Sequence, residues 1–514
     1  MALGSANPLL LAASGGDSDP VTRSLRFNGS VSSSEAGHLY RTAGTPTDEG
    51  KWTISMWVKV GQQPSNGYMT LFGAGASNDN AASVSIYNGM LYADQATSSN
   101  HRTIRCTGQV LRDPNAWYHL CFAYDNSQTG SSGNNQNAYK WYVNGVRLTE
   151  PTYSHNESVS GYTHRFNSSG YVQRIGKNAH RSYHSTYKYH WDGLIADVYF
   201  VDGQQLEPTE FIEANDYGGY KPKEYTGTYG NNGFHLKLDD SSDIGADSTS
   251  NSNDFTTTNL SSHDVMPDVP TKNYATINVL HPDGAVSAPV SEGNLKIYAN
   301  SYSGGNYEKV PATIPIPTSG KWYVEFYAYT AKGGGNISSV GVIRQQDGTW
   351  DSSSGSHYGL ATGNGFDGIS PNIYGNNMTL WSDGVAVDTD SGGTLNNSAY
   401  ICALAIDVDN GKIYGGYESG GAMTWMNSGD PTSGSTGTGA VSRTFSSDDL
   451  LTIEVVVSSN NTNGSGFVMN AGQDPTFAGN KTSGQDTSQS EFYYAPPTGF
   501  KSLNSSNLDD PTVT

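Results

Sequence analysis

Apolar and polar residues alternate along several short runs of the chain, which is the pattern of half-buried β-strands. Four runs show it, around residues 52–60, 194–200, 322–328 and 451–457. The positions that share one face are Trp52, Ile54, Met56, Val58 and Val60; Leu194, Ala196, Val198 and Phe200; Trp322, Val324, Phe326 and Ala328; and Leu451, Ile453, Val455 and Val457. The pattern predicts strands that bury one face.

Two apolar runs are interrupted by Asn-Gly, at Asn144-Gly145 and at Asn410-Gly411. Both residue types tolerate the positive φ of a two-residue hairpin turn, so each pair predicts a β-hairpin. A short helix is expected over 207–213, where Pro208 lies near the start. We therefore expect an all-β chain with two tandem β-sandwich (jelly-roll) domains.

Composition favours the same fold class. Charged residues make up 15% of the chain, while Gly (61) and Tyr (33) are abundant and suit turns and half-buried strands. The net charge of −20 argues against a nucleic-acid groove and against docking on anionic lipid. Three cysteines cannot form a disulfide framework, and Cys121 and Cys402 are interpreted as core residues.

We expect five segments. They are an N-terminal arm (1–23), a first sandwich (24–215), a connector rich in small polar residues (216–272), a second sandwich (273–507) and a short tail (508–514). The arm holds an apolar cluster, Leu9, Leu10 and Leu11, with no Lys or Arg before it. The cluster is too short to span a bilayer and lacks the basic region of a signal peptide, so we expect it to attach to a partner.

Ordered motifs of the first domain resemble the concanavalin A-like, laminin-G-type lectin fold. They are Ser-Leu-Arg-Phe27, Trp-Thr-Ile-Ser-Met-Trp-Val58, Trp-Tyr-His-Leu120, Tyr-Val-Asn-Gly145, Arg-Ile-Gly176 and Gly-Leu-Ile-Ala-Asp-Val-Tyr199. The second domain resembles SPRY-type domains through Gly-Lys-Trp-Tyr-Val-Glu325, Gly341-Val, Asp407-Val-Asp-Asn-Gly-Lys-Ile-Tyr414 and Gly-Gln-Asp-Pro475. Both resemblances imply bent β-sandwiches that bind through their surfaces.

The tandem as a whole resembles virion proteins of marine tailed phages, often called tail fibre proteins. The opening Ala-Leu-Gly-Ser-Ala-Asn-Pro-Leu-Leu-Leu11 and the joining Asp-Val-Pro-Thr-Lys-Asn-Tyr-Ala-Thr276 carry this resemblance. It implies a surface- or tail-exposed part of a virion, assembled in the host cytoplasm. It also implies contacts with other virion proteins through the arm, and self-association.

Two aromatic regions, residues 180–190 and 350–381, are the candidate contact regions. The stretch 180–190 gathers histidines and tyrosines, and the stretches 350–358 and 374–381 place aromatics among Gly, Ser and Asn. Such residues combine rigid aromatic anchors with adaptable polar neighbours. The candidate contact residues are Tyr183, His184, Tyr187, Tyr189, His190, Trp350, Tyr358, Tyr374 and Trp381. For the first region the alternatives are an ordinary extended strand or loop with exposed tyrosines, and a transition-metal site formed by its histidines. For the second region the alternative is that Tyr358 and Trp381 are core residues.

An acidic, Ser-rich run could supply oxygen ligands for Ca²⁺. The candidate ligands are Asp239, Asp243, Asp247 and Asp254. The alternative is a solvated loop in which these side chains cap turns. No other cofactor is expected.

Catalytic motifs are absent from the sequence. Glucanases of the concanavalin A-like fold carry Glu-x-Asp-x-Glu on one strand, and here no Glu is followed two residues later by Asp, while Glu325 and Glu454 stand alone. No serine-nucleophile, zinc-protease or phosphate-loop motif is present. We therefore expect a non-enzymatic virion protein that binds host-surface glycan or receptor, neighbouring virion subunits, or both. The alternatives are a purely structural decoration or tail-assembly protein, and a polysaccharide depolymerase.

Overall fold

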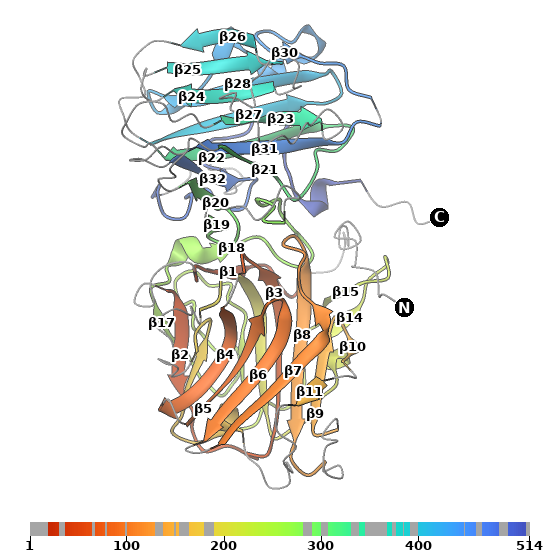
Figure 1. Cartoon of the computed structure of the whole chain (residues 1–514), viewed down its shortest axis with the longest axis vertical. Helices are drawn as coiled ribbons and strands as arrows, with labels where there is room; N and C mark the ends of the chain where they lie inside the picture. Colours follow the sequence, from red (N-terminus) through yellow and green to blue (C-terminus); the bar gives the residue numbers. More distant parts are fainter. Residues whose placement is uncertain are drawn as a thin grey trace. The chain divides into compact units, whose positions relative to one another are not determined.

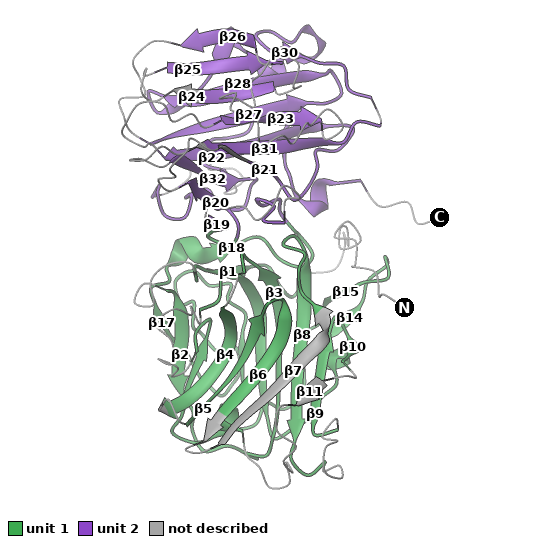
Figure 2. Ribbon diagram, viewed as in Figure 1, with its two compact units in different colours: residues 1–273, 291–293, 510–514 green, residues 274–290, 294–509 purple. Residues whose placement is uncertain are grey.

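The computed structural model divides the chain into two compact units (Figures 1 and 2). Unit 1 comprises residues 1–273, 291–293 and 510–514, and unit 2 comprises 274–290 and 294–509. The structure describes residues 19–29, 36–63, 67–77, 80–97, 100–128, 137–148, 151–153, 164–178, 190–280, 290–299, 307–329, 339–344, 367–372, 377–383, 385–390, 399–446, 448–458, 465–482 and 492–509. Within these ranges both units are β-sandwiches, which confirms the predicted fold class.

Unit 1 packs two large antiparallel sheets face to face (Figure 1). Its first sheet has the order β10-β9-β8-β3-β13-β1-β18, with β16 beside β13, and its second has the order β11-β7-β6-β5-β4-β12-β2-β17. The strands of the first sheet are β1 (Ser24–Phe27), β3 (Lys51–Val60), β8 (Trp117–Asp125), β9 (Tyr139–Val143), β10 (Val146–Arg147), β13 (Gly193–Asp202), β16 (Phe234–Leu236) and β18 (Val265–Met266). Those of the second are β2 (His38–Thr42), β4 (Tyr68–Ser77), β5 (Asn80–Tyr87), β6 (Met90–Thr97), β7 (Asn100–Val110), β11 (Pro151–Tyr153), β12 (Val172–Ile175) and β17 (Thr256–Thr258).

Smaller elements complete unit 1. A two-stranded sheet pairs β14 (Ile212–Ala214) with β15 (Tyr220–Pro222). The described part of unit 1 also contains the 3-10 turns η2 (Arg165–Asn167), η3 (Pro208–Glu210) and η4 (Ser262–Asp264). The short helix expected over 207–213 is thus the turn η3, with Pro208 at its first position.

Unit 2 pairs a large sheet of order β19-β20-β32-β22-β27-β28-β29, with β30 and β33 at its margins, and a smaller sheet of order β21-β31-β23-β24-β25-β26. The first contains β19 (Val290–Ser291), β20 (Lys296–Ala299), β22 (Lys321–Tyr329), β27 (Tyr400–Asp407), β28 (Lys412–Ser419), β29 (Ala422–Trp425), β30 (Val441–Ser442), β32 (Ser465–Asn470) and β33 (Lys501–Ser502). The second contains β21 (Tyr307–Pro311), β23 (Ser339–Arg344), β24 (Asp367–Asn372), β25 (Asn377–Ser382), β26 (Val385–Asp390) and β31 (Leu451–Ser458). The 3-10 turns are η5 (Met426–Ser428), η6 (Pro431–Thr436) and η7 (Ser505–Asn507). No helix in the described ranges has the length and hydropathy to cross a membrane.

Three of the four predicted strand faces are correct. The apolar face of β3 lies in the core of unit 1, and those of β22 and β31 lie in the core of unit 2. The fourth prediction, for 194–200, was wrong in its first half, because a β-bulge lies between Ala196 and Tyr199. Asp197 adopts φ 54° at the bulge. The core-facing residues are therefore Ile195, Val198 and Phe200.

The two predicted hairpins differ in their turns. Asn144 and Gly145 have φ of 48° and 73° and join β9 directly to β10, as expected for a two-residue loop. In the second hairpin Asp407 pairs with Lys412, so four residues form the loop. Gly411 has φ 60°, while the Asp407 carboxylate accepts hydrogen bonds from the backbone nitrogen and the side-chain amide of Asn410.

Residues 216–272, which we expected to form a connector, contribute strands to unit 1. The strands β16, β17 and β18 in this stretch pair with β13, β2 and β1. The stretch also helps to cover the outer face of the first sheet, where Cys121, Tyr142, Tyr199 and Val201 pack against Phe211 and Tyr225. Composition did not reveal this role because small and polar residues dominate the stretch as a whole.

Polar outer-face residues of β3 are buried by this cover. The Lys59 ammonium lies 2.8 Å from Asp268 Oδ2 and 2.7 Å from Asn273 Oδ1. Trp117 Nε1 donates to the other Asp268 oxygen at 3.0 Å. Burial lowers the pKa of Lys59, and the Asp268 carboxylate opposes that shift. The ion pair thereby connects residues 268–273 to the middle of the sheet.

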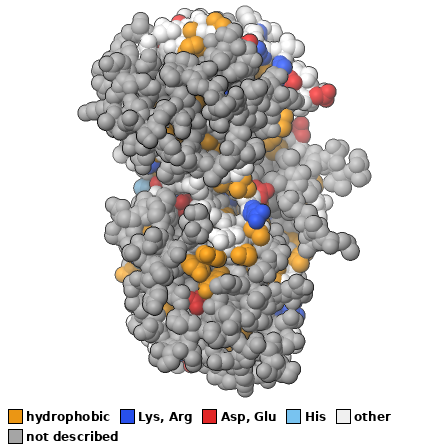
Figure 3. Space-filling view, viewed as in Figure 1, with side chains coloured by type: hydrophobic (Ala, Val, Ile, Leu, Met, Phe, Trp, Pro, Cys, Tyr) orange, Lys and Arg blue, Asp and Glu red, His pale blue; other side chains and the backbone are white. Residues whose placement is uncertain are grey.

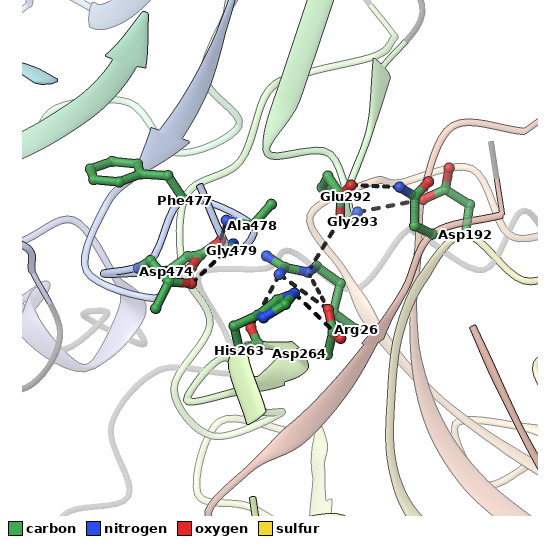
Figure 4. A network of polar contacts seen from close by, with 12 residues as sticks. Arg26, Asp192, His263, Asp264, Glu292, Gly293, Asp474, Phe477, Ala478 and Gly479 are labelled. Atoms are coloured by element: carbon green, nitrogen blue, oxygen red, sulfur yellow. Dashed lines mark hydrogen bonds and ion pairs between the residues drawn. The ribbon is translucent and has the colours of Figure 1, made fainter. Parts of the chain in front are cut away.

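Arg26 of β1 forms a second buried ionic cluster of unit 1 (Figure 4). Its Nη2 lies 3.2 Å from Asp264 Oδ1 and 3.1 Å from the His263 carbonyl, and its Nε lies 3.5 Å from Glu292 Oε2. Asp264 also closes a capping box with Ser261 at η4. Since a buried guanidinium without acceptors is costly, these contacts fix the position of the 261–264 segment.

Replacing Asp268 with Ala should destabilise unit 1 strongly. The substitution leaves the buried Lys59 ammonium without its carboxylate, which costs about 3–5 kcal/mol in comparable cases. Urea denaturation measures the loss, with Asp240→Ala as control, because the exposed Asp240 carboxylate makes local contacts such as the hydrogen bonds from the nitrogen and hydroxyl of Ser242. Equal unfolding midpoints for Asp268→Ala and the unaltered protein would contradict this role.

In unit 2, Glu454 of β31 is a buried carboxyl without hydrogen-bond partners. Neither oxygen has one in the described structure, and its cross-strand neighbours are Pro311 and Gly341, which carry no side-chain donor. Burial raises the pKa of Glu454 to about 7, partly offset by Lys309. Because the folded-state pKa exceeds the ordinary value of 4.5, ionisation of Glu454 reduces stability as the pH rises through this window.

The Glu454→Gln variant should lose this pH dependence. Between pH 5 and pH 8 the unaltered protein is expected to lose about 2–3 kcal/mol of stability through Glu454, and the neutral amide removes that loss. Denaturation curves at both pH values measure it, with the exposed Asp448→Asn as control. A pH dependence that is unchanged in Glu454→Gln would refute the assignment.

Candidate functional site

The candidate site is the outer face of five neighbouring strands in unit 1: β2, β12, β4, β5 and β6. Strand register places two rows of residues on opposite faces of this sheet. The inward row, which lies in the core, is Leu39, Ile175, Phe72, Val84 and Ala93. The outward row is Tyr40, Arg174, Gly73, Ser83 and Asp94. The outward row thus combines the exposed ring of Tyr40 and the partly exposed guanidinium of Arg174 with the buried side chains of Ser83 and Asp94.

Three tyrosines gather on the same outer face. Tyr68 of β4 stacks on Tyr87 of β5 with ring centroids 4.5 Å apart and planes 25° apart. Tyr92 of β6 completes the cluster, with its ring 4.9 Å from Tyr68 and 6.4 Å from Tyr87. Tyr68 and Tyr87 are partly exposed, whereas Tyr92 is buried. We call these three residues the tyrosine cluster.

The register of one hairpin brings the cluster together. Asn88 and Gly89, with φ of 49° and 78°, join β5 to β6 in a two-residue turn. Tyr87 therefore pairs with Met90, and Tyr92 pairs with Ser85. Tyr87 also pairs with Tyr68 on the other side. Alternation then directs all three tyrosine side chains to the outer face.

Polar groups beside the cluster are held in place by the sheet. Thr70 and Ser85 are paired across β4 and β5, and their hydroxyls lie 3.1 Å apart. Burial lowers the pKa of the Arg174 guanidinium, and neighbouring Tyr40 opposes the shift. Figure 3 shows hydrophobic side chains, a class that includes Tyr, among uncharged polar ones on the visible face of unit 1.

The chemistry of this face suits a sugar ligand. Tyrosine rings present flat apolar faces and a hydroxyl tip, and such rings lose little conformational entropy when they bind. The partly exposed Arg174 guanidinium and the tyrosine hydroxyls can supply directed hydrogen bonds to the sugar. Within the described ranges, no group of three or more His, Cys, Asp or Glu side chains is arranged to hold a metal ion.

Most of the contact residues predicted from sequence lie outside the described residues. These are Leu9, Leu10, Leu11, Tyr183, His184, Tyr187, Tyr189, Trp350, Tyr358 and Tyr374. His190 is described: its side chain is buried, and it forms an isolated antiparallel bridge with Lys177. Trp381 is partly exposed on β25, and its Nε1 donates to Ser370 Oγ at 2.7 Å.

The acidic run of 239–254 forms capped turns in the structure. Asp247 accepts hydrogen bonds from the backbone nitrogens of His235, Thr249 and Asn253 and from the Thr249 hydroxyl. Asp254 accepts from the backbone nitrogen of Asp247. Asp243 lies in a turn in which its own nitrogen donates to the Asp240 carbonyl, and Asp239 precedes that turn. The arrangement is the turn-capping alternative to a Ca²⁺ loop.

A family model described as the concanavalin A-like lectin/glucanases superfamily matches residues 33–210. The match covers all five strands of the candidate face. It agrees with the laminin-G-type resemblance of the first domain. No curated protein sequence matches the chain.

Solved structures give weaker similarities. A heptameric SAP-like pentraxin from Limulus polyphemus is 19% identical and covers 37% of this chain and 80% of its own, with a TM-score of 0.27. The SPRY domain of human HERC1 is 18% identical and covers 37% and 95%, with a TM-score of 0.25. Domains LG4-5 of the mouse laminin α1 chain are 8% identical and cover 94% and 99%, with a TM-score of 0.29. At these TM-scores the similarities carry no argument about function.

Calcium should have no effect on the stability of the 239–254 segment, because the oxygens of Asp247 already accept four hydrogen bonds. We expect equal melting temperatures in Ca²⁺ and in chelator. Asp247→Ala should lower stability by about 1–2 kcal/mol through the loss of these caps. A Ca²⁺-dependent rise in melting temperature that Asp247→Ala abolishes would favour a calcium site instead.

Proposed function

We propose that this chain is a non-enzymatic carbohydrate-binding protein, and that the outer face of β2, β12, β4, β5 and β6 contacts the glycan. The observation that carries the proposal is the tyrosine cluster beside the outward row from Tyr40 to Asp94 on one sheet face. The family match over residues 33–210 supports it, since that superfamily includes lectins.

The same face argues for binding rather than hydrolysis. Glycosidases use a pair of carboxyl groups that flank the scissile bond. Within the described parts of these five strands, Asp94 is the one carboxylate on the outer face. We therefore propose that this face binds a glycan and has no glucanase activity.

We propose further that this protein is a component of the virion of a tailed phage. The order of the two sandwich domains and the motifs at the opening and the junction of the chain support it. Many copies on one particle would multiply weak glycan contacts. The N-terminal arm would then attach the protein to other virion proteins, and the host-surface glycan or receptor would be the external partner.

Tyr87→Ala should weaken glycan binding about 5- to 30-fold, because it removes half of the stacked platform. A glycan array with multivalently displayed protein identifies a ligand, and titration then compares the variants. Tyr217→Ala is the matched control, a partly exposed tyrosine elsewhere in unit 1. Equal affinity of Tyr87→Ala and the unaltered protein would refute the proposal that this face contacts the glycan.

Two further outcomes separate the proposal from its alternatives. Failure to bind any glycan under multivalent display would favour a purely structural protein. Release of reducing ends from host polysaccharide would show a depolymerase. Mass spectrometry and immunogold labelling of purified phage particles would test the location, and absence of the chain from the particles would refute it.

A further inference from the structure

A second group of partly exposed tyrosines lies on unit 2. Its large sheet directs alternate residues of β20, β32 and β22 to the outer face. One row across these strands is Tyr298, Gly466 and Tyr329, and the next is Lys296, Val468 and Tyr327. Tyr298, Tyr327, Tyr329 and Lys296 are all partly exposed. We call these four residues the tyrosine–lysine face.

Gly466 allows the two outer tyrosines to approach each other. A Cβ at this position would lie 2.9 Å from Tyr298 Cδ2 and 2.2 Å from the Ile297 carbonyl oxygen, so a larger residue would not fit. The Tyr298 ring instead lies across β32, with its centroid 6.1 Å from that of Tyr329 and the planes 83° apart. The rings of Tyr298 and Tyr329 thus meet edge to face above three strands, and we call these two rings the platform.

Neighbouring contacts fix the platform. Asn480 Nδ2 donates to the Tyr329 hydroxyl at 2.7 Å, and the Tyr327 ring lies 5.2 Å from Tyr329 and 5.9 Å from buried Phe477. Phe477 belongs to a turn in which Asp474 Oδ2 accepts from the Ala478 nitrogen at 2.7 Å (Figure 4). Rings that are ordered before binding lose less entropy when a ligand arrives.

The tyrosine–lysine face carries one cationic side chain, Lys296, although the chain carries −20 overall. Lys296 Nζ lies 4.9 Å from the centroid of the Tyr329 ring and forms no ion pair with any residue that the structure describes. Lys481 lies 5.9 Å from the Tyr327 ring, but its ammonium is bound to Glu418 at 3.0 Å. Lys296 is therefore the ammonium available to an anionic ligand.

The rest of the outer face of this sheet is covered by the chain itself. Glu325 accepts hydrogen bonds at 2.8 Å from the backbone nitrogens of Tyr493 and Tyr494. Phe492 and Phe500 pack on Tyr323 over β22 and β27. The tyrosine–lysine face is thus the part of β20, β32 and β22 whose tyrosines keep contact with solvent.

From these observations we infer that the tyrosine–lysine face binds an acidic glycan. Sugar faces stack on Tyr298 and Tyr329, and a carboxylate or sulfate group of the sugar pairs with Lys296. A nucleic acid is disfavoured, because the single available ammonium that the described residues place here, in a strongly negative chain, cannot replace the counterions of a phosphate backbone. The inference extends the carbohydrate binding proposed for unit 1 to a second, charge-selective site.

The test uses the full-length chain and three polymers: polygalacturonate, which is carboxylated, dextran sulfate, and neutral dextran. We expect binding to at least one acidic polymer, weakened by added salt. Lys296→Gln and Tyr298→Ala should each lower the affinity about tenfold. Lys501→Gln, at an exposed lysine of the same unit, should leave it unchanged. The polymer that binds distinguishes a carboxylate from a sulfate ligand.

Three results would overturn the inference: no binding to either acidic polymer, equal affinity of Lys296→Gln and the unaltered protein, or equally strong binding of single-stranded DNA. Melting temperatures of the variants show whether they remain folded, and Lys296→Gln replaces a partly exposed side chain and should not unfold the unit. Tyr87→Ala separates the two proposals, because it should reduce binding at unit 1 and leave the Lys296-dependent affinity intact.

Discussion

The buried ammonium of Lys59 is the constraint on which unit 1 depends. A lysine on the outer face of a central strand needs an acceptor once both faces of its sheet are covered, and Asp268 and Asn273 supply it. Thr53 lies six residues earlier on the same outer face; its hydroxyl donates to the Gln204 carbonyl and accepts from the Leu206 nitrogen. The first sheet can therefore be covered only by a segment that brings polar partners to these positions.

Unit 2 meets the same requirement with a different residue. Glu325 lies on the outer face of its central strand and receives backbone nitrogens from the segment that covers it. Burial raises the pKa of Glu325 to about 7, and the donors around it oppose the shift. In both units, then, a charged side chain on the polar face of a central strand selects the segment that packs on it.

The sequence pattern predicted the strands whose apolar face meets the core, because simple alternation holds for β3, β22 and β31. It failed at Asp197, where a bulge changes the phase of β13 without any apolar signal. It also assigned 216–272 to a connector, since the partners of Lys59 and Arg26 in that stretch are polar residues typical of loops. Alternation of apolar and polar residues predicts which apolar face of a strand is buried. It gives no information on whether the polar face is buried as well.

The candidate site was missed for a related reason. Tyr68, Tyr87 and Tyr92 are not clustered in an aromatic-rich loop, and only pairing brings them together. The signal was present in Asn88-Gly89, another Asn-Gly pair, whose two-residue turn sets the register of β5 and β6. The row Tyr298–Gly466–Tyr329 could not be found in this way, because β20 and β32 are far apart in the chain.

The late position of the covering segments has a consequence for synthesis. The strand β1 lies between β13 and β18, so unit 1 completes its first sheet only after residue 266 has emerged. In unit 2, β22 receives its parallel neighbour β33 from residues 501–502, which lie about 180 positions further along the chain. During translation each unit therefore passes through a stage in which its core strands exist but one sheet is uncovered. Exposed strands at that stage are the ones most open to pairing with another nascent chain.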